Sequence, residues 1–395
     1  MRVGLDATPL LGPRTGVGRY VAGLAGALAT LAGPEPEELA LVPFSWRGTR
    51  DLPGGGLGGP RVRYGRRRAP ARLLQAAWAR LPWPPVEWLS GPVEVFHGTN
   101  FVAPPTRRAA AVVTVHDLTY LRFPEMVTDA SARYRDLVPR ALRRGAVVCT
   151  PTAAVATEVA AEYGLPPDRL VVTPLGVDPS WLATHALPDR YLLFVGNREP
   201  RKNLTGLLTA YRQLLVGVGR APSHPRAIGV GNGPTAGEGA GTTTAPATDG
   251  VPPLVLVGPP GWGEALDTAG LPPDAIRTPG YLPQPDLVRV VAGAAALIVP
   301  SWYEGFGLPA LEALACGTPV VASDLPAHRE VLGDQAELTP PGDPAALAAA
   351  LARVLDDPGD DQRRAARRAR AAGFTWENCA QATLSAYRLA LEARR

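Results

Sequence analysis

The chain is poor in cysteine and contains no long hydrophobic run. Its 395 residues include three scattered cysteines, Cys149, Cys316 and Cys379, which suit neither a disulfide framework nor a metal-ligand cluster. No apolar stretch approaches the roughly 18 residues of a membrane-spanning helix, and the first residues lack the apolar core of a secretory signal. We therefore expect a cytoplasmic protein without a metal site, either free or peripheral on the inner face of the plasma membrane.

Lysine is almost absent as well. Of the 40 Lys and Arg residues only Lys202 is a lysine, a bias typical of a GC-rich genome, and the formal net charge is +4. The apolar content of 46% and the charged content of 19% describe a soluble globular protein. A length of 395 residues exceeds a single typical core, which favours two domains.

Short apolar runs alternate with helical stretches in both halves of the chain. Strands are expected at 2–6, 93–96, 109–115, 146–150, 170–173, 191–195, 254–258, 296–300 and 319–322. This alternation favours two doubly wound α/β domains, residues 1–186 and 187–375, divided at a polar stretch near 183–190. A change of composition over 217–253 predicts a flexible insertion between a helix and a strand.

The segment from Ile298 to Asp324 has the pattern strand, glycine turn, helix, strand. Gly305 and Gly307 mark the turn, and the helix start that follows offers free backbone N–H groups to a phosphate. Glu304 in the turn and Glu312 on the early helix flank this position, and a carboxylate on those first turns can accept hydrogen bonds from hydroxyls. The segment therefore fits a ligand that is part phosphate and part polyol. An ordinary βαβ unit with solvated glutamates is the alternative.

The same segment, SWYEGFGLPALEALACGTPVVAS, resembles the signature of retaining glycosyltransferases of family 4. That resemblance implies the GT-B fold, in which two Rossmann-like domains face a central cleft, with the C-terminal helix 376–395 returning to the first domain. It also implies a nucleoside diphosphate sugar as donor, its sugar against Glu304 and its ribose on Glu312. The diphosphate would then lie on the backbone of Gly305, Phe306, Gly307 and Leu308.

A glycine loop follows the first strand in the sequence GVGRY. It lacks the third glycine of a dinucleotide fingerprint, and nine residues separate the strand from Gly16, so an NAD enzyme is not expected. In the family, such a loop faces the donor diphosphate, which implies ligand contact at Gly16. A structural turn glycine is the alternative.

Histidines follow two of the predicted strands, at His97 in HGTN and His116 in VHDL. Since ligands bind beyond the carboxyl ends of parallel strands, we expect both histidines to point into one cleft. Both segments resemble family patterns. They imply that His116 and the adjacent Asp117 contact the transferred sugar or the acceptor, with His97 in support; a structural histidine is the alternative at each position.

The single lysine stands in GNREPRKN, directly after a predicted strand. A transferase that breaks a sugar–phosphate bond must stabilise charge on the leaving diphosphate, and Arg201 and Lys202 are cations suited to that task. The segment resembles the ExRKN motif of the family, whose basic pair grips the donor phosphates. A solvated basic turn is the alternative. Tyr281 and Leu282 follow another predicted strand, in a segment that lies near the nucleobase in the family.

Residues 61–88 are basic and aromatic. They contain Trp78, Trp83 and Trp88, with no acidic residue between Arg61 and Val86. Such a stretch can lie on an anionic membrane, with a solvated surface as the alternative. No nucleic-acid-binding module surrounds it, so nucleic acid is not an expected partner.

The predicted reaction is metal-independent transfer of a hexose, with retention of configuration, from a nucleoside diphosphate sugar to a hydroxyl of a glycan or lipid-linked acceptor. No further cofactor is expected. Segments GVGRY, HGTN and VHD together resemble mannosyltransferases of polysaccharide assembly, which makes GDP-mannose the expected donor and a UDP-hexose the second. The alternatives are a sugar-nucleotide epimerase of the same fold and a non-catalytic subunit of a glycosylation complex. The predicted catalytic residues are Arg201, Lys202, Glu304 and His116.

Overall fold

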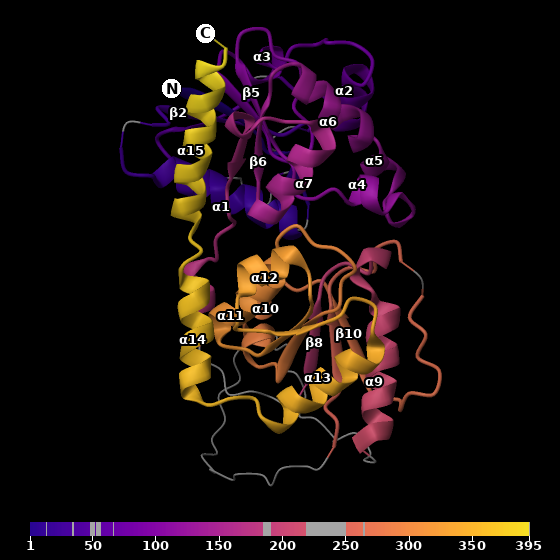
Figure 1. Ribbon diagram of the computed structural model, residues 1–395. Coiled ribbons are helices and arrows are strands. Elements are labelled where there is room, and N and C mark those ends of the chain that lie inside the picture. The colour runs from indigo at the N-terminus through magenta and orange to yellow at the C-terminus, as the bar shows by residue number, and fades with distance from the viewer. Residues whose placement is uncertain are drawn as a thin grey trace.

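Two α/β lobes lie one above the other in the computed structural model (Figure 1). The structure describes residues 1–12, 14–33, 35–47, 52, 57–65, 67–184, 191–218, 250–263 and 265–394. The predicted domain boundary at 186 and most of the predicted insertion over 217–253 lie outside the described residues.

The first lobe is built on a parallel sheet, whose seven described strands have the order β3-β2-β1-β4-β5-β6-β7. The strands are β1 (Arg2–Asp6), β2 (Glu38–Val42), β3 (Val62–Tyr64), β4 (Val95–Gly98), β5 (Ala110–Thr114), β6 (Val147–Thr150) and β7 (Leu170–Val172). Continuous apolar strands suit such a sheet, because helices cover both of its faces. Its helices are α1 (Gly16–Thr30), α2 (Ala71–Trp78), α3 (Glu87–Ser90), α4 (Thr119–Arg122), α5 (Asp129–Ala132), α6 (Tyr134–Arg143), α7 (Ala153–Tyr163) and α8 (Pro179–Leu182).

The second lobe repeats this plan with six described parallel strands in the order β10-β9-β8-β11-β12-β13. The strands are β8 (Leu192–Val195), β9 (Leu254–Val257), β10 (Ile276–Gly280), β11 (Ala296–Val299), β12 (Val320–Ser323) and β13 (Glu337–Thr339). Its helices are α9 (Leu204–Val218), α10 (Gln284–Ala292), α11 (Leu308–Cys316), α12 (Pro326–Leu332), α13 (Pro344–Asp356) and α14 (Asp361–Ala372). The Asp343 carboxylate caps the start of α13, where it accepts hydrogen bonds from the N–H groups of Ala345 and Ala346.

The last helix, α15 (Trp376–Glu392), leaves the second lobe and lies along the first (Figure 1). It packs against α1 and against strands β5, β6 and β7. Its Tyr387 is fully buried. The first lobe is therefore completed by a segment that follows the whole second sheet in the chain.

Direct polar contacts also join the lobes. The Glu330 carboxylate on α12 accepts hydrogen bonds from the N–H groups of Ala153 and Ala154 at 2.8 and 3.0 Å. It thereby caps the N-terminus of α7 in the other lobe. The hydroxyl of Tyr303 donates to Glu158 at 2.6 Å and accepts from the N–H of Leu118. No helix in the described part of the chain is long and apolar enough to cross a membrane.

Candidate active site

A cavity of about 420 Å³ lies between the lobes, where the carboxyl ends of strands from both sheets meet. All predicted site residues but Glu312 line it, which brings together segments from five loops. Those residues are Gly16, His116, Asp117, Arg201, Lys202, Tyr281, Leu282, Glu304, Gly305, Phe306, Gly307 and Leu308.

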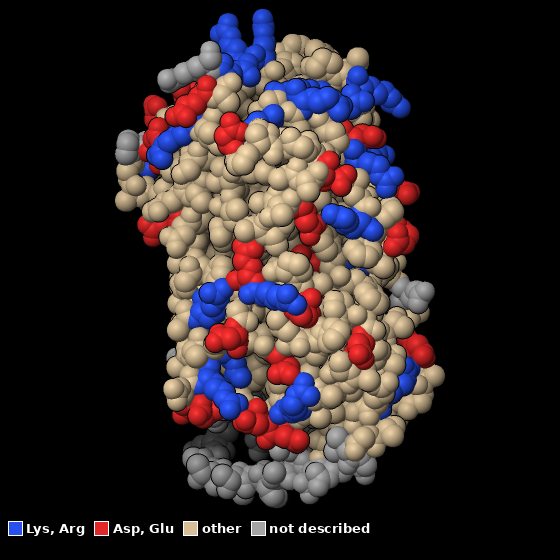
Figure 2. All heavy atoms as spheres, in the orientation of Figure 1, with Lys and Arg blue, Asp and Glu red and all other residues tan. Residues whose placement is uncertain are grey.

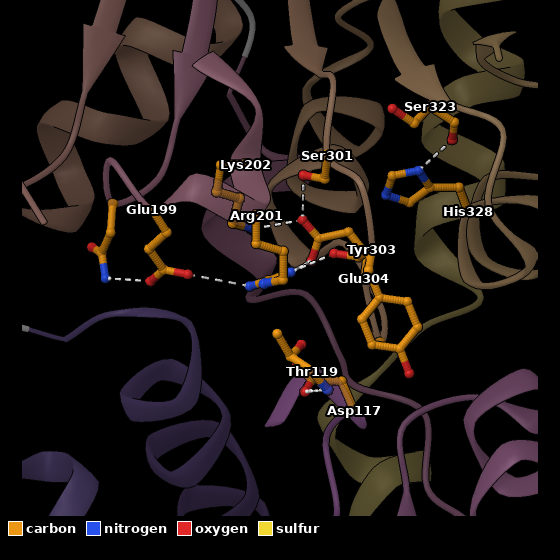
Figure 3. A network of polar contacts seen from close by, with 12 residues as sticks. Asp117, Thr119, Glu199, Arg201, Lys202, Ser301, Tyr303, Glu304, Ser323 and His328 are labelled. Atoms are coloured by element: carbon orange, nitrogen blue, oxygen red, sulfur yellow. Dashed lines mark hydrogen bonds and ion pairs between the residues drawn. The ribbon is translucent and has the colours of Figure 1, made fainter. Parts of the chain in front are cut away.

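Glu304 is the best-anchored charge in this cavity. Its carboxylate accepts hydrogen bonds from Lys202 Nζ at 2.6 Å, Ser301 Oγ at 2.7 Å and Arg201 Nη1 at 3.0 Å (Figure 3). Burial alone raises the pKa of Glu304, but the attraction of Lys202 and Arg201 outweighs it and holds that pKa well below its usual range. Glu304 is therefore a carboxylate at neutral pH, and it fixes both basic side chains.

The basic pair sits on a short 3₁₀ turn, Pro200–Lys202, at the start of α9. The next residue, Asn203, adopts a left-handed conformation with φ of 54°, and its amide donates to the Pro300 carbonyl at the end of β11. Arg201 also donates to the backbone oxygen of Tyr303 at 2.5 Å, and Glu199 lies on its other side (Figure 3). The loops after β8 and β11 are thus bound to each other, and the two cations have little freedom.

The turn before α11 depends on glycine. Gly307 has φ of 87°, a left-handed conformation that favours glycine, and it directly precedes the first helical residue. Gly305 accepts a hydrogen bond from Thr152 Oγ1 of the first lobe at 3.0 Å. Pro309 has no N–H, and Ala310 and Leu311 donate to the Gly307 oxygen, so the backbone N–H groups available to a ligand in this cavity belong to residues 305–308.

His116 belongs to the first-lobe wall of the cavity. Its Nε2 lies 2.9 Å from the backbone oxygen of Thr99, which can only accept, so Nε2 carries the proton. Burial lowers the pKa of His116, which keeps the ring neutral and leaves Nδ1 with a lone pair. Tyr20 and Phe101 pack edge-on against this ring at 5.0 and 5.5 Å and hold its plane.

The prediction that His97 also points into the cleft is wrong. His97 is fully buried, with Nδ1 2.8 Å from the Tyr387 hydroxyl on α15 and Nε2 2.7 Å from Thr114 Oγ1. The strand runs two residues further than expected, to Gly98, so His97 lies within β4 and its side chain enters the layer beneath α15. Burial lowers its pKa to about 3. His97 is a neutral structural residue, in agreement with its supporting role.

Glu312 lies apart from the other predicted site residues. It lines a neighbouring cavity and accepts two hydrogen bonds from Nη1 of Arg19, at 2.5 and 2.6 Å. Burial raises the pKa of Glu312 to about 7, although Arg19 lowers it. Arg19 was not predicted as a site residue, although it belongs to the GVGRY segment, because its partner is 293 positions away in the chain.

The described residues contain no group of three or more His, Cys, Asp or Glu side chains that could hold a metal ion. The polar groups of the cavity are instead cations, carboxylates and backbone N–H groups. Such a set can bind an anion together with a hydroxyl-rich group.

Comparison with known proteins places this geometry in a family. The model of Glycosyltransferase Family 4 matches residues 14–181, and the model of Glycosyl transferases group 1 matches residues 242–357. The O-antigen chain mannosyltransferase B of Escherichia coli is 32% identical over 313 residues, which are 75% of this chain and 74% of that protein. The chain belongs to glycosyltransferase family 4. It is an enzyme, a glycosyltransferase, as the motif around Glu304 predicted.

Further proteins extend the similarity. The MMP alpha-(1->4)-mannosyltransferase of Mycolicibacterium hassiacum is 29% identical over 267 residues, 65% of this chain and 57% of that protein. Sucrose-phosphate synthase from Thermosynechococcus elongatus has a TM-score of 0.67 at 19% identity and covers 98% of both chains. WaaG, a glycosyltransferase involved in lipopolysaccharide biosynthesis, has a TM-score of 0.62 at 15% identity and covers 99% of this chain and 98% of its own. The predicted GT-B fold is confirmed.

Proposed function

We propose that this glycosyltransferase transfers mannose from GDP-mannose to a hydroxyl of a glycan or lipid-linked acceptor, with retention of configuration and without a metal ion. The observation that carries the proposal is the pair Arg201 and Lys202, anchored on Glu304 in the same cavity as the backbone turn 305–308. The similarity to two mannosyltransferases favours mannose as the sugar. A UDP-hexose is the second donor to test.

The reaction breaks the bond between the sugar and the diphosphate, so negative charge grows on the leaving group. Arg201, Lys202 and the start of α11 offer fixed positive charge to that group, which lowers the barrier because they need no rearrangement during the step. The cavity also contains Tyr281 and Leu282 at its second-lobe rim, where they would contact the nucleobase.

The state of Glu304 argues against a covalent glycosyl-enzyme intermediate. Three donors hold its oxygens, so the carboxylate is poorly placed to attack the sugar as a nucleophile. Its charge instead lies where it can stabilise positive charge on the sugar ring. Neutral His116 offers Nδ1 as an acceptor for a sugar hydroxyl, and Asp117 lies beside it in the cavity.

A donor panel tests the proposal. GDP-mannose, UDP-glucose and UDP-N-acetylglucosamine would each be incubated with the full chain, and nucleotide release measured with and without glycan and polyprenyl-phosphate sugar acceptors. The anomeric configuration of the product would be read by NMR. We expect acceptor-dependent release of GDP and an α-linked product. Release from none of the donors would contradict the proposal, and recovery of an epimerised sugar nucleotide would favour the epimerase.

We also propose that the first lobe contacts an anionic membrane, as a lipid-linked acceptor requires. Leu73, Leu81, Trp83 and Trp88 are exposed near α2 and α3, and Figure 2 shows basic side chains gathered at this end of the lobe. Arg67 lies over the Trp88 ring at 5.9 Å. Trp78, which was expected in this surface, is buried against Phe44 and belongs to the core. Exposed indoles beside arginines suit the headgroup region of an anionic bilayer.

A further inference from the structure

The ion pair between Arg19 and Glu312 separates two cavities. The donor cavity lies on one side. A cavity of about 730 Å³ lies on the other, bounded by α1, the segment around Asp178 and the start of α15. Arg19 lines both cavities, whereas Glu312 lines only the second. The guanidinium therefore stands between the donor site and the carboxylate with which it is paired.

This pair is buried but incompletely satisfied. The side chains of Arg19 and Glu312 are 14% and 4% exposed. Arg19 Nε is buried and has no hydrogen-bond partner among the described residues. Both contacts to Glu312 come from the single nitrogen Nη1, so the planar fork of the guanidinium is not matched to the carboxylate. A buried pair with such geometry gains little over its desolvation cost and can be replaced by better partners.

Arg19 differs in this respect from Arg201 and Lys202. Arg201 and Lys202 are tied to Glu304, and their positions are fixed by backbone contacts as well. Arg19 belongs to the first turn of α1, close to Gly16, and its guanidinium donates to Glu312 of the second lobe. Its long side chain can turn toward the donor cavity without movement of either lobe.

Glu312 is also the residue on which the resemblance to family 4 places the ribose of the donor. If ribose hydroxyls donate to this carboxylate, Arg19 loses its partner while it is still buried. An unpaired buried guanidinium is strongly unfavourable. The diphosphate of the same donor, with its two negative charges, enters the cavity that Arg19 already lines.

We propose that Arg19 is a donor-recognition residue that exchanges partners. Without nucleotide, Arg19 is paired with Glu312. When the donor binds, the ribose hydroxyls donate to the Glu312 carboxylate in its place, and Arg19 pairs with the diphosphate. This inference rests on the proposed function, and it adds a third cation, from the opposite lobe, to the pair Arg201 and Lys202. Donor binding and contact between the lobes are thereby coupled through one side chain.

The test measures by calorimetry how tightly the full chain binds GDP, and by competition against GDP how tightly it binds guanosine. UDP and uridine are measured in parallel in the same way. Arg19→Met keeps the length of the side chain and removes its charge. We expect the variant to bind GDP about tenfold more weakly, the effect of one charge-assisted contact, and to bind guanosine as well as or better than the wild type. Arg353→Met, which removes an exposed ion pair with Glu337, is the matched control and should leave both affinities unchanged.

The ratio of the two affinities decides the inference. If Arg19→Met changes GDP and guanosine affinity by the same factor, or changes neither, Arg19 only ties the lobes together and the inference is wrong, while the proposed function stands. If the wild type binds neither GDP nor UDP, the proposed function itself is wrong. Circular dichroism of Arg19→Met checks that the fold is intact, and Arg19→Lys should recover part of the lost GDP affinity.

Discussion

The backbone oxygen of His116 faces Gly305 so closely that a β-carbon built on the glycine would stand 1.8 Å from it. A real β-carbon does not approach another atom to within 3.0 Å. The two residues belong to different lobes, and both line the donor cavity. The lack of a side chain at Gly305 therefore sets how closely the two halves of the site can meet.

Gly305→Ala should separate the lobes and lower kcat/KM for transfer by roughly 100-fold, because misplacement by about 1 Å has that effect on a positioned site. Steady-state kinetics with the best donor checks this. Gly26→Ala is the control, since the space around this glycine of α1 is open and alanine favours a helix. Wild-type activity in Gly305→Ala would mean that the contact seen here does not persist in the reacting enzyme.

Lys202→Met should lower kcat by about 10²–10³-fold, the usual effect of removing one preorganised charge from a leaving group. The change also removes the 2.6 Å contact to buried Glu304, so the pKa of that carboxyl should rise. Single-turnover rates measure the loss, with circular dichroism as the test of folding. Lys202→Arg keeps the charge with a different shape, so its kcat should lie between those of the wild type and Lys202→Met. Equal rates in all three proteins would exclude Lys202 from the reaction.

Asp6→Asn should stabilise the protein at pH 8 and have little effect below about pH 4. Burial raises the pKa of Asp6 from 3.8 to about 6, although Thr8 donates hydrogen bonds to it. The folded state therefore favours the protonated carboxyl. The stability that this proton contributes is complete below pH 3.8 and is lost as the pH rises through about 6. Asparagine stays neutral, so the free energy of unfolding of the variant should exceed that of the wild type by roughly 2–3 kcal/mol above pH 6.

Urea unfolding at pH 4, 6 and 8 measures this difference, followed by a probe in the first lobe. Asp360→Asn, at the exposed start of α14, is the control for loss of a charge at a surface cap. A stability difference that does not change with pH would show that Asp6 is ionised in the folded protein throughout this range.

Replacement of Trp83 and Trp88 by serine should abolish sedimentation of the protein with vesicles that contain phosphatidylglycerol. The two rings pack edge-on at 5.4 Å and are 55% and 45% exposed, so the change removes apolar surface without opening the core. Val216→Ser changes an exposed apolar residue of the second lobe and is the control. Binding by the wild type to neutral phosphatidylcholine vesicles alone, or to neither kind, would contradict the proposed contact.

The strands and the site loops were predictable because buried parallel strands are continuous apolar runs. Leu192–Val195 and Ala296–Val299 are examples, and the charged and glycine residues that follow them mark the carboxyl edge of the sheet. The strands Glu38–Val42 and Val62–Tyr64 were missed, since they lie in a segment rich in Gly, Pro and Arg, and the three-residue strand Glu337–Thr339 was missed as well. A local apolar pattern predicts a strand only where it continues over several residues.

The roles of individual side chains were less predictable, because they depend on contacts between distant segments. Arg19 gives no sign in the sequence that it reaches Glu312, and the environment of His97 is set by a helix that begins at Trp376. Glu304 was predicted on the donor sugar, yet the strength of its anchoring appears only once the loops after β8 and β11 meet.

The position of α15 bears on the order in which the protein is made. The strands of the first lobe leave the ribosome early, but the part of their sheet over β5, β6 and β7 that α15 covers lacks that helix until residues 376–392 have been synthesised. The second lobe lies between these segments in the chain, so it can complete its own core first. Although domains usually mature in the order of translation, the half of this enzyme that is translated first is the last to be finished.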